Sequence, residues 1–317
     1  MESHRLKPGR LSRFGIEHIL RGDVSARFQT SFVESQRPST TEGETNRMAK
    51  STYLFSVSTG RSGSKYLCNL LRHAEDCCSR HEPQPTMSGR PMYEYLRGNP
   101  EPLAELMPKK IRAIEAARGE RRVYSETNHC FIKGFGWLIP KWLPQEEITV
   151  IVLRRNPAAI RDSLRRIGCS PFLPAGDQWI ITPAAADHHV PLPEEFSFPM
   201  ARFRLYRLLL RTVMRPGVSR LLTGGRRSAP PFIRRYEAAL LDWYIAETDA
   251  RWRAFEARFP GIQAVEVRLE ELNQEAVVEA LFDRLGLRPA KTLADVVGKS
   301  ANLKLRRGDE SSSESAI

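Results

Sequence analysis

The run ITVIVL at residues 148–153 constrains the fold more than any other feature of the sequence. Its apolar and β-branched residues do not alternate with charged ones, which is the pattern of a strand buried on both faces. Such strands occur in parallel sheets that carry helices on both sides. The next segment, NPAAIRDSLRRI (156–167), has Pro at its first helical position and continues at helical spacing. We therefore expect an α/β protein.

The same alternation of strand and helix runs through most of the chain. Further strands are predicted at 53–58, 76–82, 121–127 and 262–267. Helices are predicted at 63–74, 91–98, 101–118, 136–143 and 274–286. Together these segments predict a three-layer α/β/α fold with a central parallel sheet, a P-loop-like strand-loop-helix and a helical insertion.

A length of 317 residues suits one large domain with additions. Residues 1–47 are polar and lack a sustained hydrophobic period, so we expect a loosely ordered N-terminal extension. The domain is predicted to span 48–308, followed by a disordered polar tail at 309–317. Within the domain, 168–235 interrupts the alternation with a loop rich in Pro and Ala and an Arg-rich helical segment.

Composition restricts the partners and the compartment. The formal net charge of +12 implies an anionic partner, such as nucleic acid, a membrane surface or a phosphorylated small molecule. No apolar run is long enough to span a bilayer. The five cysteines are odd in number and lack paired metal-ligand spacing, which indicates reduced thiols. We expect a cytoplasmic protein without a metal site.

The stretch STGRSGSKYL (58–67) follows the first predicted strand and opens a helix. A strand that feeds a Gly-containing turn and then a helix directs several backbone N–H groups at one point, which suits an anion. A Walker A loop would need one more residue between Gly60 and Lys65, and it would carry Ser or Thr where Tyr66 stands. The loop is therefore predicted to bind phosphate without the usual hydroxyl ligand for magnesium.

A second basic element follows the strand at 148–153. Arg154 and Arg155 stand at its carboxyl end, where α/β proteins bind their ligands. Ser163 lies two turns along the next helix and faces much the same way as Arg155. Arg155 and Ser163 together make a small site for a phosphate monoester. Arg154 is expected to be ion-paired or at the surface.

These residues resemble the family of sulfotransferases that use 3′-phosphoadenosine 5′-phosphosulfate (PAPS). STGRSGSKYL resembles the family's 5′-phosphosulfate loop, and Arg155-Asn156-Pro157 with Ser163 resembles its 3′-phosphate segment at the same spacing. RHEPQP, VRLEEL and DRLGL resemble three further family segments, and LRRGD near 305 resembles a fourth. The match therefore spans roughly residues 53–308. The chain departs from the pattern at Lys65, where many relatives have Thr or Tyr.

The resemblance implies PAPS as the sulfuryl donor, with no metal. Arg61 and Ser64 stand at the family's basic and hydroxyl positions of the loop. The expected donor-binding residues are Gly60, Arg61, Ser62, Gly63, Ser64, Lys65, Arg155 and Ser163. The His-Glu-Pro segment of bacterial-type members implies that its carboxylate, here Glu82, is a candidate catalytic base.

Sulfuryl transfer resembles phosphoryl transfer, in which positioning and charge stabilisation supply most of the catalysis. Arg61 would stabilise the charge that develops on the bridging oxygen, and Glu82 would accept the proton of the acceptor hydroxyl. His81 and His129 are alternative bases, and Glu82 is alternatively a structural partner of Arg61 or Arg80. Glu126, at the end of a predicted strand, either orients these groups or is structural.

The acceptor is expected to contact 168–235. Ten arginines and no acidic residue occur between Arg202 and Arg235, and Arg204, Arg207, Arg211 and Arg215 share one helical face. This pattern is either a solvated helix face or a site for an anionic acceptor, such as an acidic glycan or a lipid at a membrane surface. A small-molecule acceptor remains open, as does the oligomeric state.

Two other function classes remain. A P-loop kinase or other phosphotransferase would need Mg²⁺ and a carboxylate where Arg154 and Arg155 stand. A non-catalytic basic protein would bind nucleic acid with a steep dependence on salt. Aromatic residues do not interleave with the basic ones as in stacking platforms, so nucleic acid is the weaker expectation.

Overall fold

A computed structural model describes residues 52–213, 231–290 and 292–298. Its centre is a five-stranded sheet in which every pair of neighbours is parallel, with the order β2-β3-β1-β4-β5. The strands are β1 (Tyr53–Val57), β2 (Cys77–His81), β3 (Val123–Thr127), β4 (Ile148–Arg154) and β5 (Gln263–Arg268). Each lies within two residues of the bounds predicted from the sequence. The predicted α/β fold with a central parallel sheet is confirmed.

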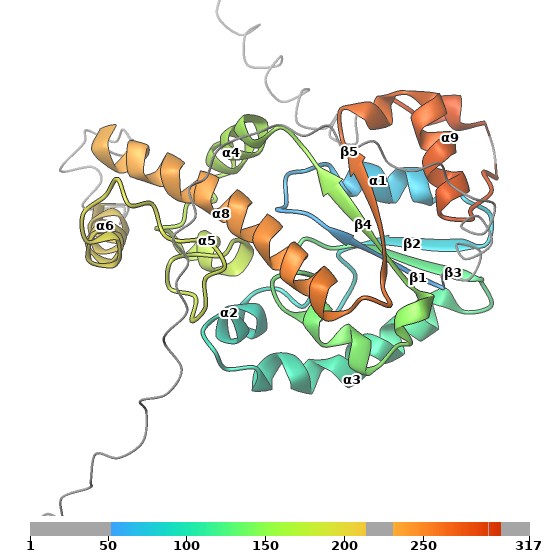
Figure 1. Ribbon diagram of the computed structural model, residues 1–317, viewed down its shortest axis with the longest axis horizontal. Coiled ribbons are helices and arrows are strands. Elements are labelled where there is room, and N and C mark those ends of the chain that lie inside the picture. Colours follow the sequence, from blue (N-terminus) through green and yellow to red (C-terminus); the bar gives the residue numbers. More distant parts are fainter. Residues whose placement is uncertain (1–51, 214–230, 291, 299–317) are drawn as a thin grey trace, which may run out of the picture. The chain divides into compact units, whose positions relative to one another are not determined.

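Helices cover both faces of the sheet (Figure 1). One face packs against α1 (Ser64–Leu71) and α9 (Glu275–Arg284), and the other packs against α3 (Glu101–Arg118) and the second half of α8 (Pro231–Arg258). The other helices of the described residues are α2 (Arg90–Leu96), α4 (Pro157–Arg166), α5 (Pro174–Trp179) and α6 (Pro199–Val213). The expected three-layer α/β/α arrangement is therefore present.

The central strand β1 shows why both layers are needed. Its side chains alternate between the two cores, with Tyr53, Phe55 and Val57 on the α3 side and Leu54 on the α1 side. β1 pairs with β3 on one side and with β4 on the other. Because all strands run in the same direction, the segments that follow their carboxyl ends meet at one edge of the sheet.

Two segments differ from the prediction. The helix expected at 136–143 is broken into two short 3₁₀ turns, Phe135–Trp137 and Ile139–Lys141. Pro140 lacks the N–H that a continuous helix needs. The turn around Gly136 is also tight, because a Cβ at this position would lie 2.6 Å from the carbonyl oxygen of Phe131. The long helix α8 was not predicted, because its buried residues face α4 and the insertion as well as the sheet, and so form no single apolar stripe.

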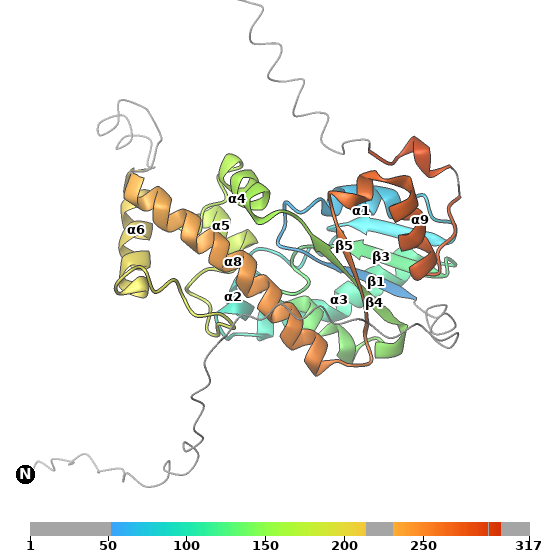
Figure 2. The same ribbon diagram turned by 45° about the horizontal axis from the view of Figure 1, so that its top comes forward.

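The insertion forms a small core of its own. Phe172, Phe203, Leu210 and Tyr236 pack together, so that α6 is held against the first turns of α8. Figure 2 shows α6 at the end of the domain that is distant from α9. The helical insertion is thus confirmed for the described residues, whereas the predictions for 1–47 and 309–317 lie outside them. No helix among the described residues is long and apolar enough to cross a membrane.

Candidate functional site

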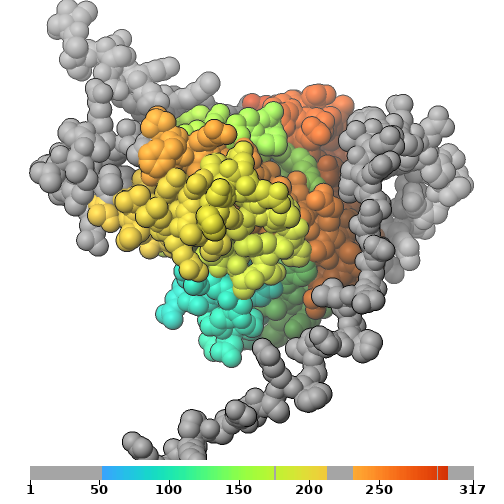
Figure 3. All heavy atoms as spheres, turned by 60° about the vertical axis from the view of Figure 1, so that its left-hand side comes forward, coloured from blue at the N-terminus to red at the C-terminus, as the bar shows by residue number. Residues whose placement is uncertain are grey.

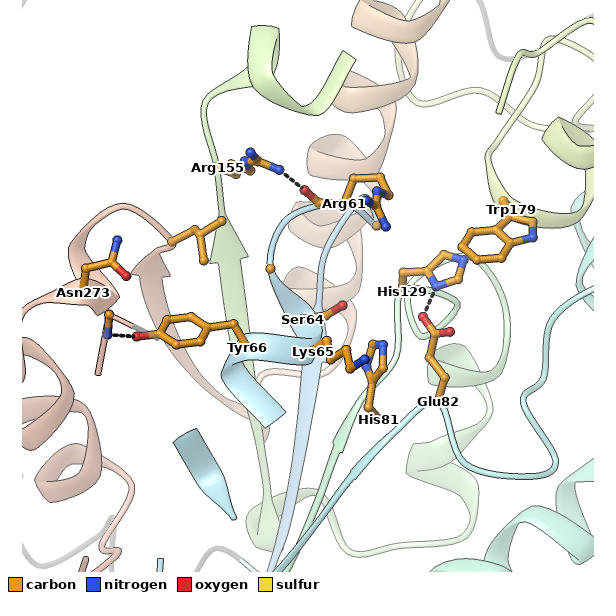
Figure 4. Close-up of a pocket in the computed structure, with 14 residues that line it drawn as sticks. Arg61, Ser64, Lys65, Tyr66, His81, Glu82, His129, Arg155, Trp179 and Asn273 are labelled. Atoms are coloured by element: carbon orange, nitrogen blue, oxygen red, sulfur yellow. Dashed lines mark hydrogen bonds and ion pairs between the residues drawn. The ribbon is translucent and has the colours of Figure 1, made fainter. Parts of the chain in front are cut away.

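A cavity of about 450 Å³ lies at the carboxyl edge of the sheet (Figure 4). It brings together the loop after β1, the ends of β2, β3 and β4, the last residue of α5 and the segment after β5. The lining residues are Gly60, Arg61, Gly63, Ser64, Lys65, Tyr66, His81, Glu82, His129, Arg155, Trp179, Leu269, Asn273 and Gly298. Eight of the residues predicted from the sequence as donor-binding or catalytic therefore line one cavity.

The loop between β1 and α1 has the backbone of an anion-binding turn. Gly60 and Gly63 have φ angles of 80° and 89°, and Arg61 adopts the same left-handed region at 57°. A Cβ at position 63 would also lie 2.3 Å from a methyl group of Leu269, so the Leu269 side chain would have to move to admit it. Gly63 and Ser64 form the start of α1 and line the cavity, so the positive end of the helix dipole lies there. Since Gly63 has no side chain to cap the helix, the first N–H groups of α1 are left for an anion.

Ser62 and Ser163 are predicted site residues whose side chains do not line the cavity. Ser62 is buried, and its Oγ lies 2.8 Å from Oγ1 of Thr59. Ser163 is also buried, and its Oγ accepts a 3.0 Å hydrogen bond from Nε of Arg61. Both hydroxyls therefore hold the loop in its conformation.

The second basic element is tied to the loop directly. Arg155 lines the cavity and donates from a terminal nitrogen to the Arg61 carbonyl oxygen at 2.5 Å. Arg154 forms ion pairs with Asp249 and Glu266, so the prediction that it is ion-paired is confirmed. Because Arg61 contacts both Arg155 and Ser163, the loop and the β4–α4 segment form one continuous basic wall.

Glu82 and His129 form a pair opposite this wall. His129 Nδ1 lies 2.6 Å from Glu82 Oε1, whereas no ion pair joins Glu82 to Arg61 or Arg80 in the described residues. Burial, followed by the charge of Lys133, lowers the pKa of His129 to about 4. Burial raises the pKa of Glu82, but the hydrogen bond from His129 and nearby positive charges outweigh it, so the net shift is downward. At neutral pH, neutral His129 therefore donates Nδ1–H to an ionised Glu82.

His81 is the second histidine at the cavity, and its tautomer follows from its partner. Its Nδ1 lies 3.1 Å from the carbonyl oxygen of Thr127, which can only accept a hydrogen bond. Nδ1 therefore carries the proton, and in the neutral ring Nε2 is an acceptor. In its neutral form His81 can therefore accept a proton at Nε2.

We expect the free energy of unfolding to fall as the pH drops from 6.5 to about 4. In this window His129 takes up a proton in the unfolded chain but not in the folded one, so the unfolded state binds more protons. Over the whole window the loss amounts to about 3 kcal/mol. Urea unfolding at a series of pH values measures it. In His129→Gln the free energy of unfolding should depend less steeply on pH. The control His73→Gln, which changes a histidine outside the cavity, should leave this pH dependence as it is. An unchanged pH dependence in His129→Gln would contradict a buried neutral imidazole.

Lys133 is a residue of the site that sequence reasoning missed. It is fully buried, and its Nζ donates to the carbonyl oxygens of Trp179 (2.7 Å) and Thr59 (3.3 Å). Burial lowers its pKa to about 8. Because its Nζ contacts Thr59, the amine lies next to the loop between β1 and α1 and adds positive potential there. The one available signal was a single lysine within the apolar run CFIKGFGW at 130–137.

Trp179 is a second residue that the sequence did not single out among the five tryptophans. Its ring stacks on His129 with centroids 5.1 Å apart and an interplanar angle of 24°. It lines the cavity and is 39% exposed, so part of its face is available to a ligand. Trp179 therefore offers a flat apolar wall next to the Glu82–His129 pair (Figure 4).

Glu126 has a structural role. Its carboxylate is buried and lies 2.7 Å from Nζ of Lys110, which is buried as well. It also accepts hydrogen bonds from the Tyr124 hydroxyl and the Asn128 amide. Because all its partners are internal and Glu126 does not line the cavity, the structural alternative holds.

The chemistry of the site points to an anionic ligand. The loop and Arg155 form a positively charged wall, and the Glu82 carboxylate that faces it can accept a proton. Among the described residues, no group of three or more His, Cys, Asp or Glu side chains could hold a metal ion.

No family model matches the sequence, and no curated protein matches it.

Proposed function

We propose that the protein is a sulfotransferase that moves a sulfuryl group from PAPS to a hydroxyl or amine of an acceptor. The observation that supports this most is the meeting of two basic elements, the loop at 60–65 and Arg155, in a cavity that also contains Glu82. A donor with phosphate groups at both ends of one ribose needs two anion sites, and a transfer to a hydroxyl needs a base.

The loop would hold the 5′-phosphosulfate. The N–H groups at the start of α1, the Ser64 hydroxyl and the Arg61 guanidinium are the donors available there. Arg155 would hold the 3′-phosphate, with Ser163 acting through Arg61. Arg155 also lines a second cavity of about 610 Å³. This cavity would offer room for the nucleoside part of the donor beside the Arg155 guanidinium.

In the transfer step, the acceptor oxygen forms a bond to sulfur while the bond from sulfur to the bridging phosphate oxygen breaks. Adenosine 3′,5′-bisphosphate leaves with that electron pair, and Arg61 stabilises the charge that develops on its oxygen. The acceptor proton passes to Glu82, whose carboxylate is kept ionised and oriented by His129. Lys133 supplies further positive potential from beneath the loop.

A kinase is the main alternative. At the end of β4 it would need a carboxylate directed to Mg²⁺, whereas Arg154 is engaged by Asp249 and Glu266 and Arg155 is directed to the loop. This arrangement favours a second phosphate over a metal ion. A non-catalytic basic protein is disfavoured by the pairing of Glu82 at the cavity with the buried His129, which a surface for nucleic acid does not require.

Arg155→Ala is expected to weaken the binding of adenosine 3′,5′-bisphosphate by about 1.5–3 kcal/mol, because it removes a charge-assisted hydrogen bond. The affinity for adenosine 5′-monophosphate should change little, because that nucleotide has no 3′-phosphate. Isothermal titration calorimetry measures both. The matched control is Arg161→Ala, which removes an arginine that pairs with Asp242 on α8. Equal losses for the two nucleotides, or equal affinities in the wild type, would contradict the assignment of Arg155.

A further inference from the structure

The insertion helix α6 has one buried face and one exposed apolar face. Phe203 and Leu210 are 2% and 7% exposed and pack into the insertion core. Leu205, Leu208 and Leu209 are 52%, 65% and 42% exposed on the other side of the helix. Such a stripe of leucines is unusual on the surface of a helix that is already packed on one side.

The apolar exposure is concentrated in this part of the molecule. The described residues include eight exposed large apolar side chains, and five of them lie within 198–232. Besides the three leucines, these are Phe198 just before α6 and Phe232 in the first turn of α8. Figure 3 shows α6, coloured yellow, at an outer face of the domain beside the start of α8, coloured light orange. We call Leu205, Leu208, Leu209 and Phe232 the leucine face.

Exposed arginines occur on both of the helices that carry the leucine face. Arg204 is exposed on α6, and Arg234 and Arg235 are exposed at the start of α8; none of the three has an ion pair within the described residues. No acidic residue occurs in the sequence between 202 and 235. The stretch of sequence that carries most of the exposed apolar side chains therefore contributes only positive charges of its own.

One carboxylate fixes how α6 is turned. Asp177 on α5 forms ion pairs with both Arg207 and Arg211. These two arginines are therefore paired with an acidic residue from outside the acid-free stretch 202–235. Since Arg207 and Arg211 lie on the side of α6 away from the leucines, this contact keeps the leucine face turned outward.

We propose that the leucine face, with Arg204, Arg234 and Arg235, docks on the surface of an anionic lipid bilayer. Leucine and phenylalanine side chains enter the boundary between headgroups and acyl chains, while guanidiniums bind lipid phosphates. A second copy of the chain is a poorer occupant, because a two-fold contact would bring two arginine-rich surfaces together. A nucleic acid would satisfy the charges but provides no apolar phase for the leucines.

Flotation of the full-length protein with vesicles tests this proposal. Vesicles of phosphatidylcholine alone are compared with vesicles that also contain phosphatidylserine, and binding should be much stronger to the second. Leu205→Gln/Leu208→Gln should weaken binding about tenfold or more, because the apolar area that enters the bilayer is lost. Arg204→Gln/Arg234→Gln should weaken it about fivefold for each arginine removed, and added salt should have a similar effect.

The controls alter the same residue types elsewhere. Ile167→Gln removes another side chain that is about as exposed, at 45%, and Arg112→Gln/Arg284→Gln removes two exposed arginines on α3 and α9. Circular dichroism melts establish that every variant is folded. The proposal is overturned if the wild type does not bind vesicles, if it binds both kinds equally, or if the control variants lose as much binding. It is also overturned if light scattering shows a dimer that Leu205→Gln/Leu208→Gln converts to a monomer.

Discussion

Replacing Glu82 by Gln is expected to lower kcat by roughly 10²–10⁴-fold, while the affinity for adenosine 3′,5′-bisphosphate is retained. The amide has nearly the same shape as the carboxylate but cannot accept the proton of the acceptor hydroxyl. The anion-binding loop and Arg155 are unchanged in this variant, so donor binding should persist. Single-turnover transfer of labelled sulfate from PAPS, with calorimetry of the bisphosphate, separates the two effects.

Two further variants make the test of Glu82 specific. Glu94→Gln neutralises a carboxylate on α2 that pairs with Arg90 and does not line the cavity, so its rate should equal that of the wild type. His81→Gln examines the other group at the cavity with an available acceptor. A normal rate for Glu82→Gln together with a large loss for His81→Gln would transfer the role of base to His81.

Glu126→Gln is expected to lower the free energy of unfolding by about 3–5 kcal/mol, since it leaves a buried charge without its partner. Lys110 and Glu126 are 1% and 0% exposed, and the pair lies between α3 and β3. The neutral amide cannot compensate the ammonium group that it faces. Chemical denaturation monitored by fluorescence measures the change.

The double variant Lys110→Met/Glu126→Leu distinguishes a charge effect from a packing effect. It removes both charges at once, so it should recover much of the stability that the single variant loses. If Glu126→Gln kept its stability to within about 1 kcal/mol and instead lost catalytic rate, Glu126 would have a functional role and the structural assignment would be wrong.

The sequence was most informative where one local cause determines the structure. The continuous apolar run of β4 predicts a strand buried on both faces, and Asn156-Pro157 predicts the start of α4, because caps and hydrophobic periods act over a few residues. The loop at 60–65 was also predictable, since Gly63 is needed for a positive φ angle. The close approach of the Leu269 side chain to Gly63 could not be predicted, because Leu269 lies far along the chain.

The parts that were not predictable depend on contacts between distant residues. His129 pairs with Glu82 across 47 positions, and Asp177 neutralises Arg207 across 30, so neither partner is visible from local spacing. Lys133 is buried because carbonyl oxygens of two other segments surround it. Helix α8 packs against other elements on several sides, so its apolar residues do not form a single stripe. The helical spacing of apolar residues by which a helix is recognised in a sequence is therefore absent.

The central claim is that the cavity binds a nucleotide with separate 3′- and 5′-phosphates, and one titration tests it most directly. Calorimetry of the wild-type protein compares adenosine 3′,5′-bisphosphate without metal against ATP with Mg²⁺. We predict that the bisphosphate binds more tightly and that added Mg²⁺ does not improve its binding, because Arg61 and Arg155 supply the positive charge. Tighter binding of ATP with Mg²⁺ would contradict the account and favour a phosphotransferase.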